Sequence, residues 1–558
     1  MDNFNKRLRL LIAGFALVMA CAGARAFWVT VVKASDLRAK ADTQQMQKAV
    51  VPAPRGDISD RNGTPLAVSE PAVDVIANPM IIKNPAAMAT VLAPLVGMTP
   101  NDVLAKISDR SKGFAYVARQ VPASAVDRIR AIRIAGKRPD GLSLEATTRR
   151  AYPRGQQAGQ LIGFVGTDEK GLSGLEYSLD SALKGTDGER ETVSDARGRA
   201  LLVEDLKSMK PGKSVRLTID APVQDEVERV LSGVAETFQP KGATAIVADP
   251  RTGAILALAN YPPVNANAIG QATPYAQTNK ATGFTYEPGS TFKAITISSA
   301  LESGVVQPSS EFFLPVELQA GDKTIHDSHE RGDETLPVTQ ILAQSSNVGA
   351  AKIGLATGPK RFDSWIHKFG FDKPTGVGLP GEERGLVPKL ANYSEATLPN
   401  MSMGQGLSVT PMQMVQAYSA IANGGVKVVP RIVESVAGKA SHSKHPERIL
   451  SRRVSTQMRQ MLKGVLADGG TASGAAIPGF DLAGKTGTAQ KVDPQTGTYS
   501  ESKYIASFIG FAPARDPKLL VAVVVDEPAG DIYGGSVAAP AFSRIMAFAL
   551  PYLGIAPQ

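Results

Sequence analysis

The chain has 558 residues, which is too long for one ordinary domain and predicts several folded parts. Hydrophobic residues make up 43% and charged residues 20%, values typical of a folded protein, so a wholly disordered chain is excluded. The formal net charge of +9 is spread along the sequence without a long basic run, so no nucleic-acid partner is expected.

The first segment combines basic residues with a long apolar run. Three basic residues within the first nine positions precede residues 10–32, and this run is long enough to cross a ~30 Å hydrocarbon core at ~1.5 Å per residue. Basic residues before a span favour a cytoplasmic N-terminus. We therefore expect a cytoplasmic tail over 1–9, a single-pass anchor over 10–32 in the cytoplasmic (inner) membrane, and a periplasmic or otherwise extracytoplasmic body. The alternative is a cleavable signal peptide, because Ala24-Arg25-Ala26 resembles a small-x-small cleavage site.

A polar, helix-compatible stretch over residues 33–49 is typical of a juxtamembrane stalk. From residue 50 to about 210, short apolar runs alternate with glycine, proline and charged residues. This pattern predicts an α+β pedestal module over 50–210 with a structural or partner-binding role. Lys210-Pro211-Gly212-Lys213 marks its expected end.

The sequence pattern over residues 215–555 predicts an antiparallel sheet with helices packed on both faces. The whole chain is therefore expected to be a multidomain α+β protein. Strand-like runs separated by turns indicate two hairpins, and helical stretches lie between and after them. The predicted strands are 243–248, 254–259, 505–512 and 519–525, and the predicted helices are 291–303, 337–356 and 538–553.

Ser290 and Lys293 form the first candidate catalytic pair. Pro288 and Gly289 end the preceding structure, so Ser290 is expected at the start of a helix with Lys293 one turn further on the same face. A serine hydroxyl becomes a good nucleophile only when a base takes its proton. A lysine can be that base if burial or a nearby positive charge lowers its pKa. Ser-x-x-Lys alone is a weak signal, because an exposed helical turn has the same pattern.

The second motif is Ser345-Ser346-Asn347, inside or beside the predicted helix that starts at residue 337. A serine and an asparagine two positions apart can present a proton relay and an amide to one cleft. Alone, such a cluster is more often an ordinary turn.

The third motif is Gly-Lys-Thr-Gly-Thr at residues 484–488, which is typical of an extended edge strand. Lys485 and the hydroxyls of Thr486 and Thr488 can hold a carboxylate there. Gly487 is expected to leave room for a substrate backbone to approach closely.

Two nucleotide-binding patterns also occur, and their context excludes both. Residues 479–486 match G-x-x-x-x-G-K-[ST], but small residues precede them and no helical pattern follows. The G-x-G-x-x-G match at 376–381 contains Pro380 and is not followed by a helix. Among the five histidines, His326 and His329 are expected at the surface or in a cleft, since nothing supplies a complete ligand set. We expect no metal and no cofactor.

Ser-x-x-Lys, Ser-x-Asn and Lys-Thr-Gly, in this order, are the motif set of β-lactamases and penicillin-binding proteins. Here they fall at positions 290, 345 and 485. Together with further segments, they make the chain resemble class B penicillin-binding proteins over nearly its whole length, and the cell-division (FtsI) type most. These further segments are 55–63, 66–67, 150–155, 171–176, 404–411, 422–425 and 533–540.

The resemblance implies a peptidoglycan D,D-transpeptidase that cross-links the stem peptides of lipid II-derived strands through an acyl-serine, with release of D-Ala. It implies a transpeptidase domain over 215–555 and assigns roles residue by residue. The implied roles are Ser290 as nucleophile, Lys293 as base, Ser345 as proton relay, Lys485 as its electrostatic support, Asn347 as ligand of the substrate amide, Thr486 and Thr488 as ligands of the terminal carboxylate, and the N–H groups of Ser290 and Thr488 as oxyanion hole.

The resemblance also implies β-lactams as covalent inhibitors, and a membrane glycosyltransferase of the FtsW type and other division proteins as partners at the septum. A lateral-wall transpeptidase remains an alternative, because it shares the chemistry. A D,D-carboxypeptidase or a β-lactamase would use water as acceptor, and neither needs the 50–210 module. A β-lactam sensor would add further membrane spans.

Overall fold

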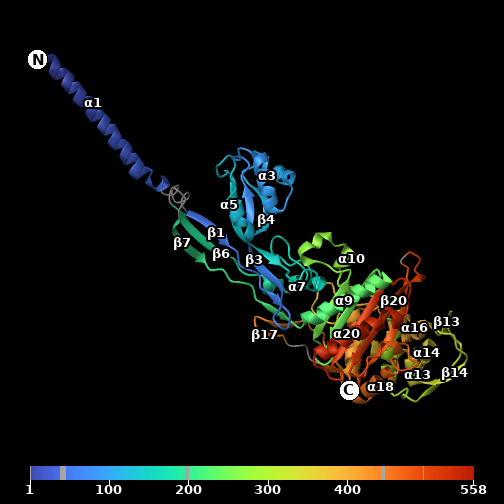
Figure 1. The fold of residues 1–558 in the computed structure, drawn as a ribbon. Helices are drawn as coiled ribbons and strands as arrows, with labels where there is room; N and C mark the ends of the chain where they lie inside the picture. Colours follow the sequence, from blue (N-terminus) through green and yellow to red (C-terminus); the bar gives the residue numbers. More distant parts are fainter. Residues whose placement is uncertain (1, 38–45, 195–199, 442–445, 494, 558) are drawn as a thin grey trace. The chain divides into compact units, whose positions relative to one another are not determined.

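The computed structural model describes residues 2–37, 46–194, 200–441, 446–493 and 495–557 (Figure 1). The described chain divides into two compact units that interleave along the sequence. Segments 55–70 and 149–184, which lie within the predicted 50–210 module, belong to the same unit as the predicted catalytic domain. Unit 1 comprises the described parts of Met1–Pro54, Pro71–Thr148 and Gly185–Pro211, and unit 2 those of Arg55–Glu70, Arg149–Lys184 and Gly212–Gln558.

The N-terminal helix α1 (Asp2–Phe27) continues into a π-helical turn, η1 (Trp28–Val32). None of its described side chains is buried, and within the described residues this 31-residue stretch is the one helix long and apolar enough to span a membrane. Residues 2–9 of the predicted tail are therefore helical as well. The predicted stalk over 33–49 ends in a strand, β1 (Met46–Val51), instead of a helix, while its residues 38–45 lie outside the described part.

Unit 1 contains two sheets. In the first, β6 (Gly188–Ser194) pairs antiparallel with β1 and with β7 (Ala200–Lys207). In the second, the part of β3 (Pro65–Ala77) that lies in unit 1 pairs with β4 (Ala115–Pro122) from Ala72 to Ala77. Helices pack on this second sheet around a core that includes Leu92 and Val103. The other elements here are α3 (Pro85–Val96), α4 (Pro100–Ile107), η2 (Ala123–Ala125), α5 (Val126–Arg130) and β5 (Leu142–Ala151), of which Arg149–Ala151 belong to unit 2.

The centre of unit 2 is a five-stranded antiparallel sheet in the order β10-β9-β21-β20-β19. Both predicted hairpins are confirmed, as β9 with β10 and as β20 with β21. The 484–488 motif lies in β19, which has one strand neighbour and is an edge strand, as predicted. The strands are β9 (Gly242–Ala248), β10 (Ile255–Tyr261), β19 (Ala483–Val492), β20 (Tyr499–Ala512) and β21 (Leu519–Asp526).

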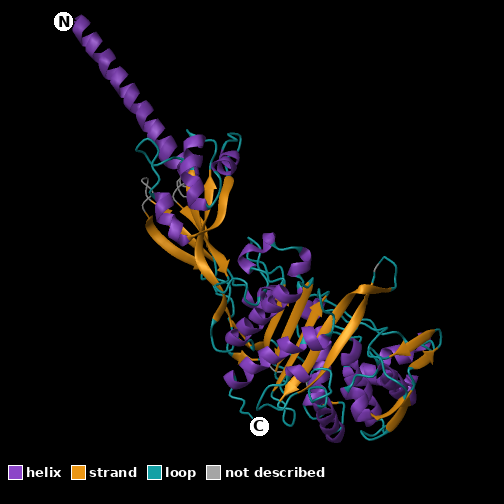
Figure 2. Ribbon diagram, turned by 45° about the vertical axis from the view of Figure 1, so that its right-hand side comes forward, coloured by secondary structure: helices purple, strands orange, loops and turns teal. Residues whose placement is uncertain are grey.

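Alternate side chains of these strands belong to two separate hydrophobic cores, because successive residues of a strand point to opposite faces of the sheet. Leu520 and Val524 pack with one set of helices, and Val521 and Val523 with the other. The predicted arrangement, with helices on both faces of an antiparallel sheet, is therefore confirmed (Figure 2). On the Val521 side lie α9 (Ala221–Phe238) and α20 (Ala539–Tyr552), and on the other α11 (Lys280–Gly283), α12 (Lys293–Glu302), α17 (Pro411–Ala422) and α18 (Arg452–Lys463).

Further helices and strands complete unit 2. They are β2 (Ile58–Ser59), α6 (Gly159–Ile162), α7 (Gly174–Ser178), α8 (Asp180–Leu183), β8 (Val215–Leu217), η3 (Ala266–Gln271), α10 (Pro274–Gln277), η4 (Gly289–Phe292), β11 (Glu311–Leu314), β12 (Glu317–Ala320), β13 (Lys323–His326), β14 (Glu334–Pro337), α13 (Val338–Ala343), α14 (Asn347–Thr357), α15 (Pro359–Phe369), η5 (Leu390–Asn392), α16 (Thr397–Ser402), β15 (Val426–Lys427), β16 (Val433–Val436), β17 (Lys439–Ala440), β18 (Glu447–Arg448), η6 (Ser473–Ala475) and α19 (Gly534–Val537).

A buried charge cluster joins three of the segments on which the family resemblance rests. The fully buried Glu176 accepts from Arg55 Nε at 2.6 Å and from Arg150 Nε at 2.7 Å. Arg55 also donates to Asp180 at 2.7 Å. Charges taken out of water need partners of opposite sign, so these segments depend on one another for their place in unit 2.

Candidate active site

All three sequence motifs contribute to one cleft in unit 2. A cavity of about 690 Å³ is lined by Ser290 from η4, Ser345 from the turn before α14, Asn347 from the start of α14, and Thr486 and Thr488 from β19. His326 and His329 also line it, which agrees with their predicted place at the surface or in a cleft. Lys293 and Lys485 are fully buried beneath this surface.

The turn that carries Ser290 is held tightly against the edge strand. Gly289 has φ = +52°, and a Cβ there would lie 2.9 Å from the carbonyl oxygen of Thr488, so only glycine fits this backbone and this space. Thr291 Oγ1 donates to the carbonyl of Pro288 at 2.7 Å, and Tyr418 Oη donates to the carbonyl of Thr291 at 2.7 Å. The half-buried Ser290 thus begins a helical run, as predicted, with Lys293 one turn on.

Lys293 is surrounded by neutral hydrogen-bond acceptors. Its Nζ donates to the Ser345 carbonyl at 2.5 Å, to Asn347 Oδ1 at 2.6 Å and to Ser345 Oγ at 3.3 Å. Burial lowers the pKa of Lys293 to about 7, and the nearby Asp327 carboxylate acts in the opposite direction. A large fraction of Lys293 is therefore uncharged near neutral pH, which a general base requires.

The predicted helix over 337–356 is wrong in one respect, because the chain forms two helices instead of one. Helix α13 ends at Ala343, and α14 begins at Asn347. Between them Ser345 has φ = +63°, a left-handed conformation that costs of order 1–3 kcal/mol for a residue with a Cβ. This break turns Ser345 and Asn347 together toward Lys293, which a continuous helix would not do.

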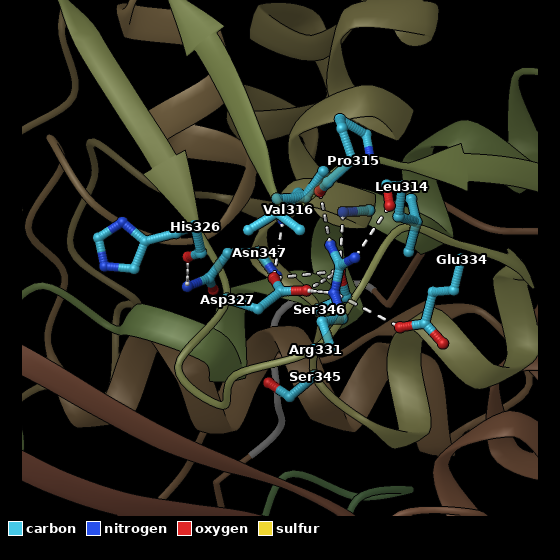
Figure 3. Close-up of polar contacts among 12 residues, drawn as sticks. Leu314, Pro315, Val316, His326, Asp327, Arg331, Glu334, Ser345, Ser346 and Asn347 are labelled. Atoms are coloured by element: carbon cyan, nitrogen blue, oxygen red, sulfur yellow. Dashed lines mark hydrogen bonds and ion pairs between the residues drawn. The ribbon is translucent and has the colours of Figure 1, made fainter.

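Asp327, which the sequence analysis did not single out, holds the start of α14 in place. Its carboxylate accepts from Ser346 Oγ at 2.9 Å and from the backbone N–H groups of Asn347 and Val348 (Figure 3). Arg331 Nε pairs with it at 2.6 Å. Hydrogen bonds from these groups lower the pKa of Asp327 despite its burial, so it is ionised at neutral pH.

Strand β19 presents the lysine and threonines of the third motif. Lys485 Nζ donates to the carbonyl and the hydroxyl of Thr486, at 3.3 and 3.2 Å. The Thr486 hydroxyl lies 2.7 Å from that of Thr471, and Thr488 Oγ1 accepts from the N–H of Gly534 at 3.1 Å. Burial and the neighbouring Lys293 ammonium lower the pKa of Lys485 well below its ordinary value. Because residues 484–486 lie in a strand, the nucleotide-loop pattern has no helix to follow it.

Packing inside the protein gives a reason for glycine at position 487. A Cβ at Gly487 would lie 2.4 Å from Ser507 Oγ, 2.9 Å from Thr291 Cγ2 and 3.0 Å from the Pro288 carbonyl oxygen. Atoms of this protein therefore occupy the side of the strand to which a Cβ at this position would point. Glycine is required because the nucleophile turn and β20 pack directly against β19.

Sequence reasoning did not find three residues beside the cleft, namely Asp327, Thr471 and Gly534. Asp327 lies beside His326, but its link to Asn347 spans 20 residues and no short motif records it. Thr471 reaches β19 from a turn and Gly534 from the start of α19, and Gly534 belongs to segment 533–540, which carries part of the family resemblance. These residues are close to the site only in the folded chain, and no short spacing in the sequence indicates their place.

Comparison with known proteins agrees with the geometry. Residues 243–547 match the family described as Penicillin binding protein transpeptidase domain, and residues 50–217 match that described as Penicillin-binding Protein dimerisation domain.

Relatives match over nearly the full chain. The probable peptidoglycan D,D-transpeptidase PenA of Neisseria gonorrhoeae is 34% identical over 562 residues, covering 99% of this chain and 94% of PenA. The peptidoglycan D,D-transpeptidase FtsI of Escherichia coli is 33% identical over 565 residues, covering 99% and 92%. Among solved structures, penicillin-binding protein 3 of Mycobacterium tuberculosis, complexed with aztreonam, superposes with a TM-score of 0.71 at 30% identity, covering 91% of this chain and 98% of that one.

Proposed function

This chain belongs to the class B penicillin-binding proteins, and we propose that it is a serine-type peptidoglycan D,D-transpeptidase whose nucleophile is Ser290. The observation that carries the proposal is the convergence of the three motifs on one cleft, where Lys293 is fully buried, has a lowered pKa and bonds to Ser345 and Asn347. A neutral amine one helical turn after the serine is suited to accept the proton of its hydroxyl.

The proposed reaction has two acyl transfers. Lys293 takes the proton of Ser290 Oγ as that oxygen bonds to the carbonyl carbon of D-Ala–D-Ala. The C–N bond breaks, and the terminal D-Ala leaves with a proton relayed through Ser345, which Lys485 supports electrostatically. An amine on a neighbouring strand then attacks the acyl-serine and regenerates the Ser290 hydroxyl.

Binding roles are proposed for the remaining residues of the cleft. Asn347 binds the substrate amide, and the hydroxyls of Thr486 and Thr488 hold the terminal carboxylate. The N–H groups of Ser290 and Thr488 stabilise the oxyanion. The close packing of η4 on β19, seen at Gly289, supports this pairing because it brings the two backbones together.

Labelling with a fluorescent penicillin, followed by peptide mapping, tests the nucleophile. A β-lactam resembles acyl-D-Ala–D-Ala, so wild-type protein should carry the label on the peptide that contains Ser290. Ser290→Ala should fold with an unchanged circular dichroism spectrum and take up no label. Persistent labelling of a folded Ser290→Ala protein would refute the assignment. Supplying a stem-peptide substrate with and without an acceptor amine then separates transpeptidation from carboxypeptidation.

We also propose a location and a role in the cell. The exposed apolar helix α1 supports a single-pass anchor, with residues 50–210 as pedestal and 215–555 as transpeptidase domain outside the cytoplasm. Full-length likeness to FtsI supports action at the division septum. The matched families account for an acyl-transfer domain and a dimerisation domain, so the glycan strands would come from a partner, a membrane glycosyltransferase of the FtsW type.

A further inference from the structure

We infer that Asp327, paired with Arg331, is a positioning residue for acylation: its carboxylate fixes the first turn of α14 and so holds Asn347 against Lys293. The inference rests on the proposed function and concerns the same cleft. Asp327 lies in the segment after β13, outside the three sequence motifs.

Four donors converge on the Asp327 carboxylate (Figure 3). They are Ser346 Oγ at 3.1 and 2.9 Å from the two oxygens, the N–H of Asn347, the N–H of Val348 at 3.0 Å and Arg331 Nε at 2.6 Å. The first N–H groups of an 11-residue helix such as α14 have no partner within the helix, and a carboxylate satisfies them well. The carboxylate therefore fixes the first turn of α14, which carries Asn347.

Arg331 connects the Asp327 carboxylate to the end of β11. Its Nη1 donates to the Leu314 carbonyl at 2.9 Å, and its Nη2 donates to the Pro315 carbonyl at 3.0 Å. Glu334 lies 3.4 Å from its Nε. The Arg331 and Asp327 side chains are only 16% and 10% exposed, so water screens the pair weakly. The position of α14 is thereby tied to the end of β11.

The Asn347 side chain has one orientation available. Its Nδ2 donates to the carbonyl of His326, the residue before Asp327, at 3.0 Å, so its Oδ1 faces Lys293 Nζ at 2.6 Å. The backbone N–H and the side chain of Asn347 are thus both held by the segment that carries Asp327. A shift of this segment would move the acceptor that orients the base.

Two charged groups face Lys293 from the elements packed against it. Asp327, from the segment after β13, raises its pKa, and Lys485 lies buried beside it on β19. The turn at Ser345 and the start of α14 present neutral groups. Arg331 offsets part of the Asp327 charge. Loss of Asp327 should therefore lower the pKa of Lys293, whereas loss of Arg331 should raise it.

The test is the second-order rate constant of acylation by a fluorescent penicillin, measured from pH 5 to 10 on the full-length chain in detergent. We expect Asp327→Asn to lower the maximal rate about 10- to 100-fold and to move the midpoint of the profile down by about one pH unit. Arg331→Gln should move the midpoint up by about one unit. A purely structural pair would lower both rates without moving the midpoints in opposite directions, so midpoints that stay at the wild-type value would overturn the inference.

Two further variants keep the test decisive. The double variant Asp327→Asn/Arg331→Gln has no unpaired buried charge, so it should fold even if the single variants do not. It should acylate about tenfold or more slowly than wild type, with a midpoint between those of the single variants. A wild-type rate in this variant would overturn the inference. Asp322→Asn removes an exposed carboxylate five positions away and should leave rate and midpoint unchanged. Wild-type protein that is not labelled at Ser290 would instead refute the proposed function itself.

Discussion

Lys293 Nζ lies 2.6 Å from Asn347 Oδ1, although 54 residues separate the two in the sequence. The partner is a neutral amide, and no carboxylate is paired directly with this lysine among the described residues. A carboxylate in that position would stabilise the ammonium form and keep the lysine protonated. The amide instead orients the amine while leaving it able to lose its proton.

The rate of acylation should rise with pH. The folded-state pKa of Lys293 is about 7, so the neutral, basic form is scarce at pH 5 and dominant at pH 9. We expect a single rising step in the acylation rate constant with a midpoint near 7. Lys293→Arg keeps the positive charge but cannot lose its proton in this range, and it should abolish acylation at every pH. The exposed Lys360→Arg is the matched control. A flat profile, with acylation shown to be rate-limiting, would contradict the role of Lys293.

Gly487→Ala should slow acylation, because the added methyl group would disturb the packing of β19 against the nucleophile turn. The added Cβ would lie 2.4 Å from Ser507 Oγ and 2.9 Å from Thr291 Cγ2, so β19 must move away from the nucleophile turn. We expect a loss of acylation of about 100-fold, measured with a fluorescent penicillin. Ser507→Ala removes the nearest of these atoms, and in the double variant part of the rate should return.

Gly474→Ala is a suitable control for that experiment, because nothing lies within 4 Å of a Cβ there and its backbone is not left-handed. It should acylate at the wild-type rate. Equal rates for Gly487→Ala and wild type would show that the strand and the turn can separate without cost to the reaction.

Glu176→Gln should destabilise unit 2 strongly. The substitution leaves the buried guanidinium groups of Arg55 and Arg150 without their shared carboxylate, which costs about 3–5 kcal/mol. Urea unfolding followed by the fluorescence of Trp365 measures the effect. Glu70→Gln breaks a half-exposed pair with Arg149 and should cost at most about 1 kcal/mol. Similar losses in the two variants would show that the buried cluster is not a major source of stability.

The sequence pattern predicted the hairpins and the edge strand of unit 2 and the motif residues that line the cleft. It did not predict the contacts that orient those residues. The two hairpins and the edge strand follow from alternation and turn residues, which act over a few positions. The break at Ser345 does not, because the carboxylate that holds the new helix start comes from Asp327, far along the chain. The packing at Gly487 was likewise invisible, since Ser507 and Thr291 reach it only in the folded chain. A short motif identifies the residues that carry the chemistry. The contacts that hold these residues in position come from residues distant in the sequence.

Protease added to spheroplasts should digest the body of the protein before any detergent is present. The expectation rests on the exposed apolar helix α1 and on the basic residues near its start, which favour a cytoplasmic N-terminus. A cytoplasmic marker protein should survive until the membrane is dissolved. Mass analysis of the mature chain should find residues that precede Phe27. A mature N-terminus at Phe27 would show cleavage at Ala24-Arg25-Ala26 and would remove the anchor.

Depletion in a rod-shaped host should give filaments whose septa fail while growth in length continues. The three motifs cannot decide between septal and lateral-wall synthesis, because both processes use the same acyl transfer. The likeness to FtsI over 99% of this chain favours the septum, since it extends through the N-terminal part that carries no catalytic motif. A plasmid copy with Ser290→Ala should fail to restore division, whereas the wild-type copy should restore it, which ties the phenotype to the acyl transfer. Round cells that still divide would instead identify the lateral wall as the place where this enzyme acts.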